Sequence, residues 1–505
     1  MLPGIIRSHG SATRIPARRA SGKAMLGALL AAAACAVAAC SGGGGIAGIA
    51  GVEGTAGGSI NDPGGPPEIT LSASAAGGAH PAAAWPEFNQ NGARTGIAPG
   101  LPRAGRLSHR WTAHLDGAVY GQPLVVGGLV IAATENDSVY ALNRSTGKVA
   151  WRHHLGTPVQ QGQVQCGNIF PLGITGTPVY DRGNGLVYAV AEMLIGRRVH
   201  HVLFGLSVVS GAVRVERDIP APDGNSQHDQ QRPGLTITAG RVYVAFGGLA
   251  GDCGQYRGTL AGVPLSGGGK IISFMTPTSR EGAIWGTGGP VIGPHGDLWV
   301  STGNGAAGPG DRYDGSDSVI RLSPALRRLD FFAPASWADD NASDLDLGSS
   351  QPVLAAGNST FIMGKRGVGY LLDTLGMGGI GHQRAARSIC AAFGAASVSG
   401  STVYEPCSGG KMAAVAVNAK RGTIRVLWRG PRDANGSPVI GGGAVWVTSY
   451  SDGSPGTLYE LNPANGAVRS RISIADALPH FSSLSLAGGT AFVSTMNGVT
   501  AINGA

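Results

Sequence analysis

Apolar residues in this chain occur in short runs separated by turn-forming residues. Residues 120–154 contain four such runs in succession: Gln122–Val126, Leu129–Ala133, Ser138–Leu142 and Lys148–Arg152. The separating residues are Gly127-Gly128, Glu135-Asn136-Asp137 and Ser145-Thr146-Gly147. Each run is too short for a helix and rich in Val, Leu, Ile and Tyr, so each predicts a strand. Four consecutive strands joined by tight turns predict one antiparallel sheet.

The same unit recurs along the chain. Its clearest copy is Gly436–Ile474, where a Pro-Val strand, a Gly turn, an apolar run and Leu-Tyr-x-Leu-Asn follow in the same order. Copies begin near residues 122, 177, 234, 289, 351, 395, 437 and 482, at intervals of about 40–60 residues. One such sheet cannot bury both of its faces, so it must stack on its neighbours. The repeats therefore predict an all-β fold, an eight-bladed β-propeller of four-stranded antiparallel blades.

The last copy, Ser482–Asn503, contains only three strands. Leu107–Leu115 (LSHRWTAHL) resembles Val149–Leu155 (VAWRHHL), the outer strand of the first copy. We therefore expect this N-terminal segment to supply the missing outer strand and to close the ring. Closure by both ends of the chain removes exposed sheet edges. Residues 85–505 are the expected propeller domain.

The first 39 residues are expected to be a signal peptide. A basic segment precedes an apolar stretch, Met25–Ala39, which is too short to span a membrane. Val37-Ala38-Ala39-Cys40 resembles a bacterial lipobox, which implies cleavage before Cys40 and lipid attachment to its sulfur. The alternative is an ordinary cleavage site with Cys40 incidental. Residues 40–84, rich in Gly, Ala, Ser and Pro, are expected to be a flexible tether. The expected location is the bacterial cell envelope, outside the cytoplasm, anchored to a membrane by lipid.

The positive charge of the chain is concentrated before Cys40. The whole chain carries +8, and five basic and no acidic residues precede Cys40, so the remainder carries +8 − 5 = +3. No later basic run is interleaved with aromatic residues. We therefore expect no nucleic-acid partner.

Four cysteines lie in the expected domain: Cys166, Cys253, Cys390 and Cys407. Four cysteines allow three pairings, and export favours disulfides. We expect Cys166–Cys253, which would join loops of neighbouring blades, and Cys390–Cys407, which are close in sequence. Four unpaired cysteines in the core are the alternative.

In a propeller, the segments that enter the innermost strands meet at one mouth of the central channel. Several of these segments are polar, and one contains a Trp. They include Gln122, Thr177, Gln230-Gln231-Arg232, Trp285, Asp346, Phe393, Ser437 and His480. Each of these residues on its own is most often explained by the formation of a turn. Their shared position predicts a small-molecule or protein partner at the mouth, with Gln231 and Arg232 among the residues that bind a cofactor.

A blade signature connects the chain to a known superfamily. Ala141-Leu142-Asn143-x-x-Thr146-Gly147-Lys148-x-x-Trp151 resembles the repeat of quinoprotein alcohol dehydrogenase-like propellers. That superfamily includes pyrroloquinoline quinone (PQQ) dehydrogenases and the non-catalytic outer-membrane assembly lipoprotein of the BamB type. Trp85–Gly96 (WPEFNQNGARTG) is similar to a segment of exported PQQ-like propeller proteins. The resemblance implies an eight-bladed propeller with PQQ and Ca²⁺ as cofactors in its enzymatic members.

The resemblance also implies site residues. Ile284–Gly305 resembles the segment with the Trp under the quinone and a Ca²⁺-ligating Asn, here Trp285 and Asn304. Asp346, with Asp344 in reserve, matches the catalytic Asp, Lys365 matches the cation that contacts the quinone oxygens, and Glu192 matches a Ca²⁺-ligating Glu. Ca²⁺ prefers such oxygen donors and acts as a Lewis acid on the quinone. Asp346 would take the alcohol proton and Lys365 would stabilise the reduced cofactor.

Two departures keep a second function open. The adjacent Cys-Cys pair of many superfamily enzymes is absent, and no Cys-x-x-Cys-His haem motif is present. The first hypothesis is a PQQ/Ca²⁺-dependent alcohol or sugar oxidoreductase, and the second is a non-catalytic scaffold for protein partners. The remaining acidic motif, Asp311-x-x-Asp314-Gly-x-Asp317, is expected to be a solvated loop.

Overall fold

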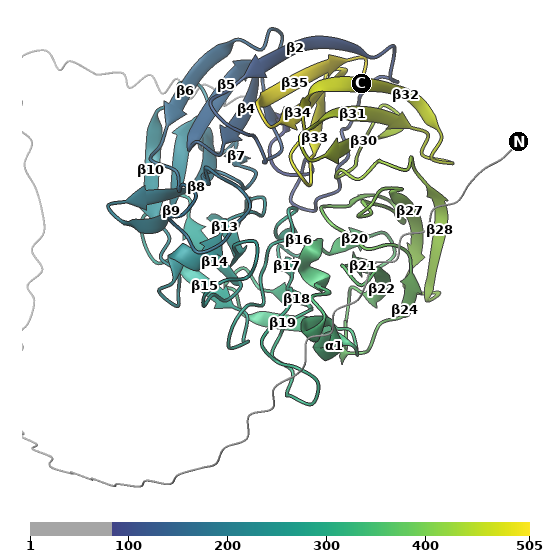
Figure 1. Ribbon diagram of the computed structural model, residues 1–505. Coiled ribbons are helices and arrows are strands. Elements are labelled where there is room, and N and C mark those ends of the chain that lie inside the picture. Colours follow the sequence, from purple (N-terminus) through teal and green to yellow (C-terminus); the bar gives the residue numbers. More distant parts are fainter. Residues whose placement is uncertain (1–82) are drawn as a thin grey trace, which may run out of the picture. The chain divides into compact units, whose positions relative to one another are not determined.

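Eight β-sheets arranged in a ring form the domain (Figure 1). This computed structural model describes residues 83–505. The expected signal peptide, Cys40 and the tether up to residue 82 lie outside the described residues. No helix within the described part of the chain is long and apolar enough to cross a membrane.

Blades 1–4 occupy the first half of the described chain. Blade 1 contains β1 (Ala83–Trp85), β3 (Leu124–Val126), β4 (Leu129–Thr134), β5 (Ser138–Asn143) and β6 (Val149–His154). Blade 2 contains β7 (Val179–Asp181), β8 (Leu186–Ile195), β9 (Arg198–Ser207) and β10 (Val213–Asp218). Blade 3 contains β11 (Asp229–Gln230), β12 (Thr236–Thr238), β13 (Arg241–Gly248), β14 (Thr259–Pro264) and β15 (Ile272–Met275). Blade 4 contains β16 (Val291–Ile292), β17 (Leu298–Ser301), β18 (Val319–Leu322), β19 (Arg328–Ala333) and β23 (Gly379–Ile380).

Blades 5–8 complete the ring. Blade 5 contains β20 (Val353–Ala355), β21 (Ser359–Met363), β22 (Val368–Asp373) and β24 (Ala385–Ser388). Blade 6 contains β25 (Ser397–Ser399), β26 (Thr402–Glu405), β27 (Ala413–Asn418) and β28 (Thr423–Arg429). Blade 7 contains β29 (Val439–Gly441), β30 (Ala444–Ser451), β31 (Ser454–Leu461) and β32 (Val468–Ala477). Blade 8 contains β33 (Leu484–Ala487), β34 (Thr490–Thr495), β35 (Gly498–Asn503) and β2 (Ser108–His114). The short helices are η1 (Ser226–His228), α1 (Trp337–Ala342) and η2 (Leu347–Ser349).

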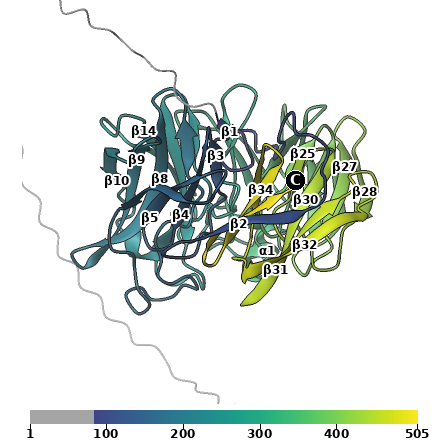
Figure 2. The same cartoon turned by 90° about the horizontal axis from the view of Figure 1, so that it is seen from above.

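The predicted eight-bladed fold is confirmed. In each blade, the first strand of the repeat begins two residues after the predicted start of that copy, as at Leu124, Val179 and Leu484. The predicted ring closure is also confirmed, because β2 pairs antiparallel with β35 along Ser108–His114. Figures 1 and 2 show β2 lying beside the C-terminal strands. Three blades gain a short fifth strand that the repeat pattern does not predict: β1, β11 and β23.

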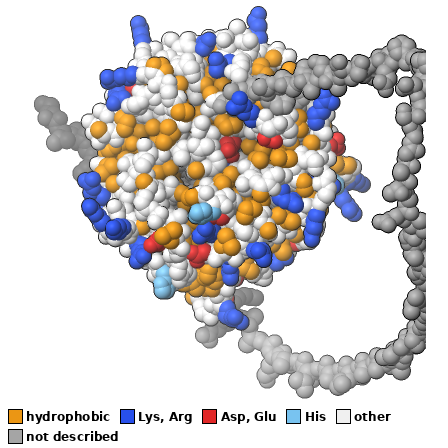
Figure 3. Space-filling model, turned by 180° about the vertical axis from the view of Figure 1, so that it is seen from behind, with side chains coloured by type: hydrophobic (Ala, Val, Ile, Leu, Met, Phe, Trp, Pro, Cys, Tyr) orange, Lys and Arg blue, Asp and Glu red, His pale blue; other side chains and the backbone are white. Residues whose placement is uncertain are grey.

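Neighbouring blades bury each other's apolar faces. One buried cluster combines Val126 and Ile131 of blade 1 with Val187 and Phe204 of blade 2, and similar clusters fill the other blade interfaces. Alternation along each strand sends successive side chains to opposite faces, so every central strand contributes to two clusters. The outer strands remain partly exposed and carry charges such as Arg425 on β28. Figure 3 shows Lys and Arg side chains spread around the outline of one face.

A Trp on an outer strand links several blades to the next. The Trp111 indole donates to the Arg144 carbonyl (3.1 Å), Trp151 donates to Val208 (2.9 Å) and Trp428 donates to Pro463 (2.7 Å). Each indole lies over a left-handed glycine of the neighbouring turn. At Gly147, with φ of 73°, a Cβ atom would lie only 2.7 Å from the Trp111 ring. The Thr-Gly and Trp positions of the repeat signature are thus two sides of one contact between blades.

Residues 85–98, which we call the axial strap, cross one end of the ring axis. Backbone bonds connect the strap to blades 2, 4, 6 and 7, through Tyr180, Ile292, Val398 and Ile440. Gln122 of blade 1 accepts from the Trp85 indole (2.7 Å). The Arg94 side chain is buried, forms an ion pair with Glu87 (2.7 Å) and donates to the Leu235 carbonyl of blade 3 (2.9 Å). The strap therefore joins six blades.

Replacing Arg94 by Met should destabilise the domain. The change would leave the partly buried Glu87 carboxylate without its ion-pair partner and would remove the bond to Leu235. Breaking a buried ion pair in this way costs about 3–5 kcal/mol. Urea unfolding should show this loss, while Arg425→Met, on an exposed strand position, should change the free energy of unfolding by less than about 0.5 kcal/mol. Equal effects of the two variants would contradict a structural role for the strap.

Candidate functional site

A cavity of about 500 Å³ lies among the ends of the inner strands. Segments that enter inner strands contribute Trp285, Phe393 and Phe481, and the ends of second strands contribute Asn304 and Lys365. Leu249–Asp252 and Asp452 form further parts of its wall. Its volume is in the range of small-molecule sites, about 300–1,000 Å³.

Three aromatic rings converge in this cavity. Trp285 lies 6.3 Å from Phe393 and 6.2 Å from Phe481, measured between ring centroids. The Phe393 and Phe481 rings are nearly parallel, with centroids 6.2 Å apart. Phe481 adopts a positive φ of 61°, an uncommon conformation for an aromatic residue. Together the rings offer flat apolar surfaces for a ligand.

Lys365 occupies the polar side of the cavity. Its Nζ lies 2.5 Å from Asp346 Oδ2 and 2.6 Å from Asp344 Oδ1, and it is 5.7 Å from the Trp285 ring centroid. Asp346 is buried, whereas Asp344 is exposed. Burial raises the pKa of Asp346, and Lys365 opposes that rise. Burial lowers the pKa of Lys365, but the combined attraction and hydrogen bonds of Asp346 and Asp344 outweigh it, so the pKa is raised. The cavity thus contains a carboxylate and an ammonium group in direct contact.

Close backbone packing fixes Asp346. Asp346 Oδ1 accepts from the Asn304 backbone N–H (2.7 Å), and a Cβ atom on Gly303 would overlap that carboxylate. Asp317 Oδ1 accepts from the backbone N–H of Leu347 (2.8 Å), and the Asp317 N–H donates to the Gly303 carbonyl (3.0 Å). Asp317 is fully buried, so the expectation of a solvated loop is wrong at this residue. Its carboxylate, which holds Leu347, and its backbone N–H, which holds Gly303, together tie the Asp346 segment to the Asn304 segment.

Asn304 connects both carboxylates. Its backbone N–H contacts Asp346, and its side-chain Nδ2 donates to Asp344 Oδ1 (2.8 Å). Its Oδ1 is buried and has no hydrogen-bond partner among the described residues. Trp285, Asn304, Asp346 and Lys365, which the sequence selected separately, therefore meet in one cavity.

Glu192 is not part of this group. It lies at the outer end of β8, directly opposite His201 in the β8–β9 hairpin, and its Oε2 is 3.4 Å from His201 Nε2. Both side chains are buried near Asp229 of β11, and neither lines the cavity. The structure therefore does not bring Glu192 together with Asn304 and Asp346. Within residues 83–505, no group of three His, Cys, Asp or Glu side chains is placed to hold a metal ion.

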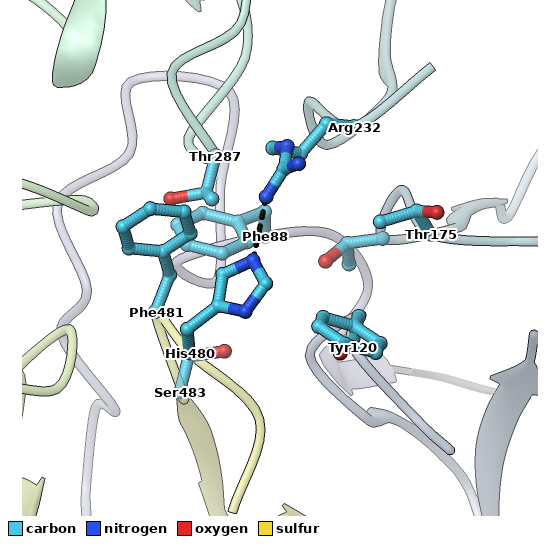
Figure 4. Close-up of a pocket in the computed structure, with 9 residues that line it drawn as sticks. Phe88, Tyr120, Thr175, Arg232, Thr287, His480, Phe481 and Ser483 are labelled. Carbon is cyan, nitrogen blue, oxygen red and sulfur yellow. Dashed lines mark hydrogen bonds between the residues drawn. The ribbon is translucent and has the colours of Figure 1, made fainter. Parts of the chain in front are cut away.

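The two remaining mouth residues have different surroundings. Gln231 is buried, donates to the Pro233 carbonyl (2.5 Å) and does not line the cavity. Arg232 does line it. Its guanidinium donates to His480 Nε2 (2.8 Å; Figure 4). It also donates to Gln230 Oε1 (3.0 Å). Of this pair, only Arg232 is available to a ligand in the cavity.

Both predicted disulfides are present. Cys166–Cys253 has a Cα–Cα distance of 6.1 Å, and Cys390–Cys407 has one of 5.7 Å. The first holds part of the cavity wall, because Cys253 follows Asp252 and because a Cβ atom on Gly251 would contact Cys166. A bridge within the wall reduces its freedom to move.

Several lining residues were not selected from the sequence. Phe481 lies in the mouth segment beside His480, where an aromatic residue in the position of Trp285 and Phe393 is the available signal. Asp252 and Tyr256 lie in the loop between β13 and β14, and the Tyr256 hydroxyl donates to Asp252 (2.6 Å). Nothing in the repeat pattern distinguishes that loop.

Comparisons with known proteins agree on the architecture. A family model described as "Outer membrane protein assembly factor BamB" matches residues 107–317. A polyvinylalcohol dehydrogenase from a Pseudomonas species is 23% identical over 257 residues, 44% of this chain and 36% of that protein. The chain therefore spans about a third of the length of that relative.

Solved structures of two kinds resemble the domain. A quinohemoprotein alcohol dehydrogenase from Pseudomonas putida HK5 has a TM-score of 0.66 at 14% identity, covering 83% of this chain and 80% of that one. A europium-containing methanol dehydrogenase has a TM-score of 0.61 at 14% identity (81% and 89% covered). BamB from Moraxella catarrhalis has a TM-score of 0.56 at 15% identity (78% and 99% covered). At these identities the structures show the fold alone.

Burial of acidic residues near Glu192 should make stability depend on pH. Burial raises the pKa of Glu135 to about 8, of Asp137 to about 9 and of Asp229 to about 7. Each binds its proton more tightly in the folded protein than when unfolded, where carboxyl pKa values are near 4. Stability should therefore fall as the pH rises from about 5 to 8.

Glu135→Gln removes one of these groups and keeps an acceptor for the Gly173 N–H and the Thr175 hydroxyl. Melting temperatures measured from pH 5 to 8 should fall less steeply in this variant than in the unmodified protein. The matched control is Glu216→Gln, at an exposed position on β10, which should leave the slope unchanged. Parallel curves for Glu135→Gln and the unmodified protein would contradict the assignment.

Proposed function

Because the chain belongs to the PQQ-like propeller superfamily of quinoprotein alcohol dehydrogenase-like proteins, we propose that its cavity binds a pyrroloquinoline quinone-type cofactor. On this proposal the protein is an oxidoreductase acting on alcohol or sugar hydroxyl groups. One observation carries the proposal: Trp285, Asn304, Asp346 and Lys365 line a single cavity of about 500 Å³.

The residues present fit a flat, anionic quinone. Trp285 and the two Phe rings offer apolar faces for a planar ring system. Lys365 and Arg232 supply positive charge and N–H donors for carboxylate and carbonyl oxygens. When bound, a quinone supplies the two-electron oxidant that amino-acid side chains lack.

The donor set fits a divalent metal less well. Asn304 Oδ1 is free of partners among the described residues, but Asp346 is already engaged by Lys365 and by a backbone N–H. Glu192, the third expected ligand, faces His201 instead. Ca²⁺ takes six to eight oxygen ligands, so these residues do not form its site, and we derive no catalytic step through a metal ion.

The protein groups can handle the proton of an alcohol. Lys365 opposes the rise that burial causes in the pKa of Asp346 and orients its carboxylate, one oxygen of which is held by the Asn304 N–H. An alcohol hydroxyl within reach of Asp346 would donate its proton to that carboxylate as the alcohol is oxidised. The Lys365 ammonium would stabilise negative charge that develops beside it. Phe393 and Phe481 line the same cavity, and their apolar rings would limit the access of water to a bound ligand.

A scaffold for protein partners is the second candidate. The observation in its favour is the match of residues 107–317 to the family model described as an outer membrane protein assembly factor. In that case the cavity would have no catalytic cofactor, and exposed outer strands or loops would bind the partner. Cofactor binding distinguishes the two candidates.

Titration of the purified domain with pyrroloquinoline quinone should quench Trp fluorescence with a dissociation constant in the micromolar range. Trp285→Phe should remove most of the quenching, and Lys365→Met should weaken binding by at least tenfold. Trp151→Phe, on the outer strand of blade 1, is the control and should bind like the unmodified protein. The titration is run with Ca²⁺ and with a chelator.

Dye-linked oxidation of alcohols and sugars by the loaded protein is measured in parallel. Asp346→Asn should reduce the rate by at least a hundredfold while cofactor quenching persists. No quenching at micromolar quinone, with or without Ca²⁺, would overturn the oxidoreductase and favour the scaffold.

Export and lipid anchoring are part of the same proposal. Two disulfides fit an oxidising compartment outside the cytoplasm, and Cys40 lies in the lipobox-like sequence. Expression in a bacterial host with radiolabelled palmitate should label the full chain and place it in the membrane fraction. Cys40→Ala should remove the label and release the protein, whereas Cys390→Ala together with Cys407→Ala should keep the label. Membrane association of Cys40→Ala equal to that of the unmodified chain would contradict the lipid anchor.

A further inference from the structure

A second, much smaller cavity adjoins the large one on the ring axis. Its volume is about 10 Å³, which is room for one water-sized group. Arg232, His480 and Phe481 line both cavities, and Phe88 of the axial strap lines the small one. Tyr120 and Thr287 also line this space, which we call the axial well, and Figure 4 shows Arg232 and His480 facing each other across it.

Arg232 enters the well without a negative partner. Its two hydrogen-bonded acceptors, His480 Nε2 and Gln230 Oε1, are neutral groups. Burial, and then Arg232 itself, lowers the pKa of His480 to about 3, so this imidazole is neutral. No carboxylate in residues 83–505 lies within ion-pairing distance of Arg232. A guanidinium has five N–H donors, so three remain after these two bonds.

The more distant carboxylates do not neutralise Arg232. After Tyr120, Glu135 is the acidic group with the largest electrostatic effect on Arg232. Burial raises the pKa of Glu135 to about 8, so this residue is mostly protonated at neutral pH. Glu192 faces His201 at 3.4 Å. The guanidinium also lies over the Phe481 ring, 5.7 Å from its centroid, which fixes its plane. The charge in the well is therefore positive and held in place.

Hydroxyl groups around the well add donors. Thr287 Oγ1 is buried and has no hydrogen-bond partner among the described residues. Thr177 Oγ1 accepts from the Gln122 N–H (2.8 Å), so its own hydrogen is available to another acceptor. A small space that combines a fixed guanidinium with free hydroxyl donors suits an acceptor without hydrogens of its own, which is an anion.

We propose that the axial well binds one small monoanion: a halide ion, or one oxygen of a carboxylate that reaches in from the large cavity. Arg232 supplies the charge, and Thr287 and Thr177 supply further hydrogen bonds. The site does not depend on the proposed quinone, and it is tested in the absence of quinone.

The test measures chloride binding by the purified domain. Chloride-35 line broadening and melting temperature are followed during titration with sodium chloride, at constant ionic strength maintained with sodium methanesulfonate, an anion too large for the well. Both signals should saturate in the unmodified protein. Arg232→Met should weaken binding by at least tenfold, while Arg214→Met, at an exposed position on β10, should bind as the unmodified protein does.

Thr287→Val keeps the side-chain shape and removes one donor, so it should weaken chloride binding severalfold even if Arg232→Met fails to fold. Competition with sodium acetate distinguishes the two sources. Displacement of chloride by acetate identifies a carboxylate entering from the large cavity, and no displacement identifies a halide site; both support the proposal. Signals that do not saturate in the unmodified protein, or chloride binding as strong in Thr287→Val and Arg232→Met as in the unmodified protein, would overturn it.

Discussion

Each sheet of this domain has two apolar faces, and only another sheet can cover them. A row of stacked sheets would leave the first and last faces in water, so the row has to close on itself. β2 provides that closure, because it carries the N-terminal part of the chain into the blade that the C-terminus forms. The Trp111–Gly147 contact then joins this shared blade to blade 1. Every loop at the ring axis, including those around the cavity, takes its position from this closed packing.

The sequence predicted the ring well because the ring repeats. Eight copies of one alternating pattern give eight independent chances to recognise a strand, and the resemblance of Leu107–Leu115 to Val149–Leu155 identifies the closing strand. The extra strands escaped prediction because they are not repeats: β11 is two residues of an inserted loop that pairs with the end of β13. Periodicity has no information about insertions of this kind.

The site was predictable in part, for the same reason. Trp285, Asn304, Asp346 and Lys365 occupy ends of strands that the repeat positions, so their meeting follows from the fold. Glu192 was misplaced because β8 and β9 extend further than the other hairpins, and their register sets Glu192 opposite His201. Recognition of that long hairpin would have indicated the pair, since directly opposed residues in a hairpin are neighbours. The position of the Phe481 ring depends on a left-handed backbone conformation, which the sequence does not predict for a phenylalanine.

The axial strap has one more consequence. Phe88 of the strap lines the axial well, so the strap forms part of the wall of the space inside the ring on that side. Because the strap crosses this end of the ring axis, we expect a ligand of the large cavity to enter and leave from the other end. A ligand held tightly beside the strap would then stay in place while smaller molecules bind and leave the large cavity in turn. We therefore expect a ligand that enters the cavity later to leave before the one bound deepest in the ring.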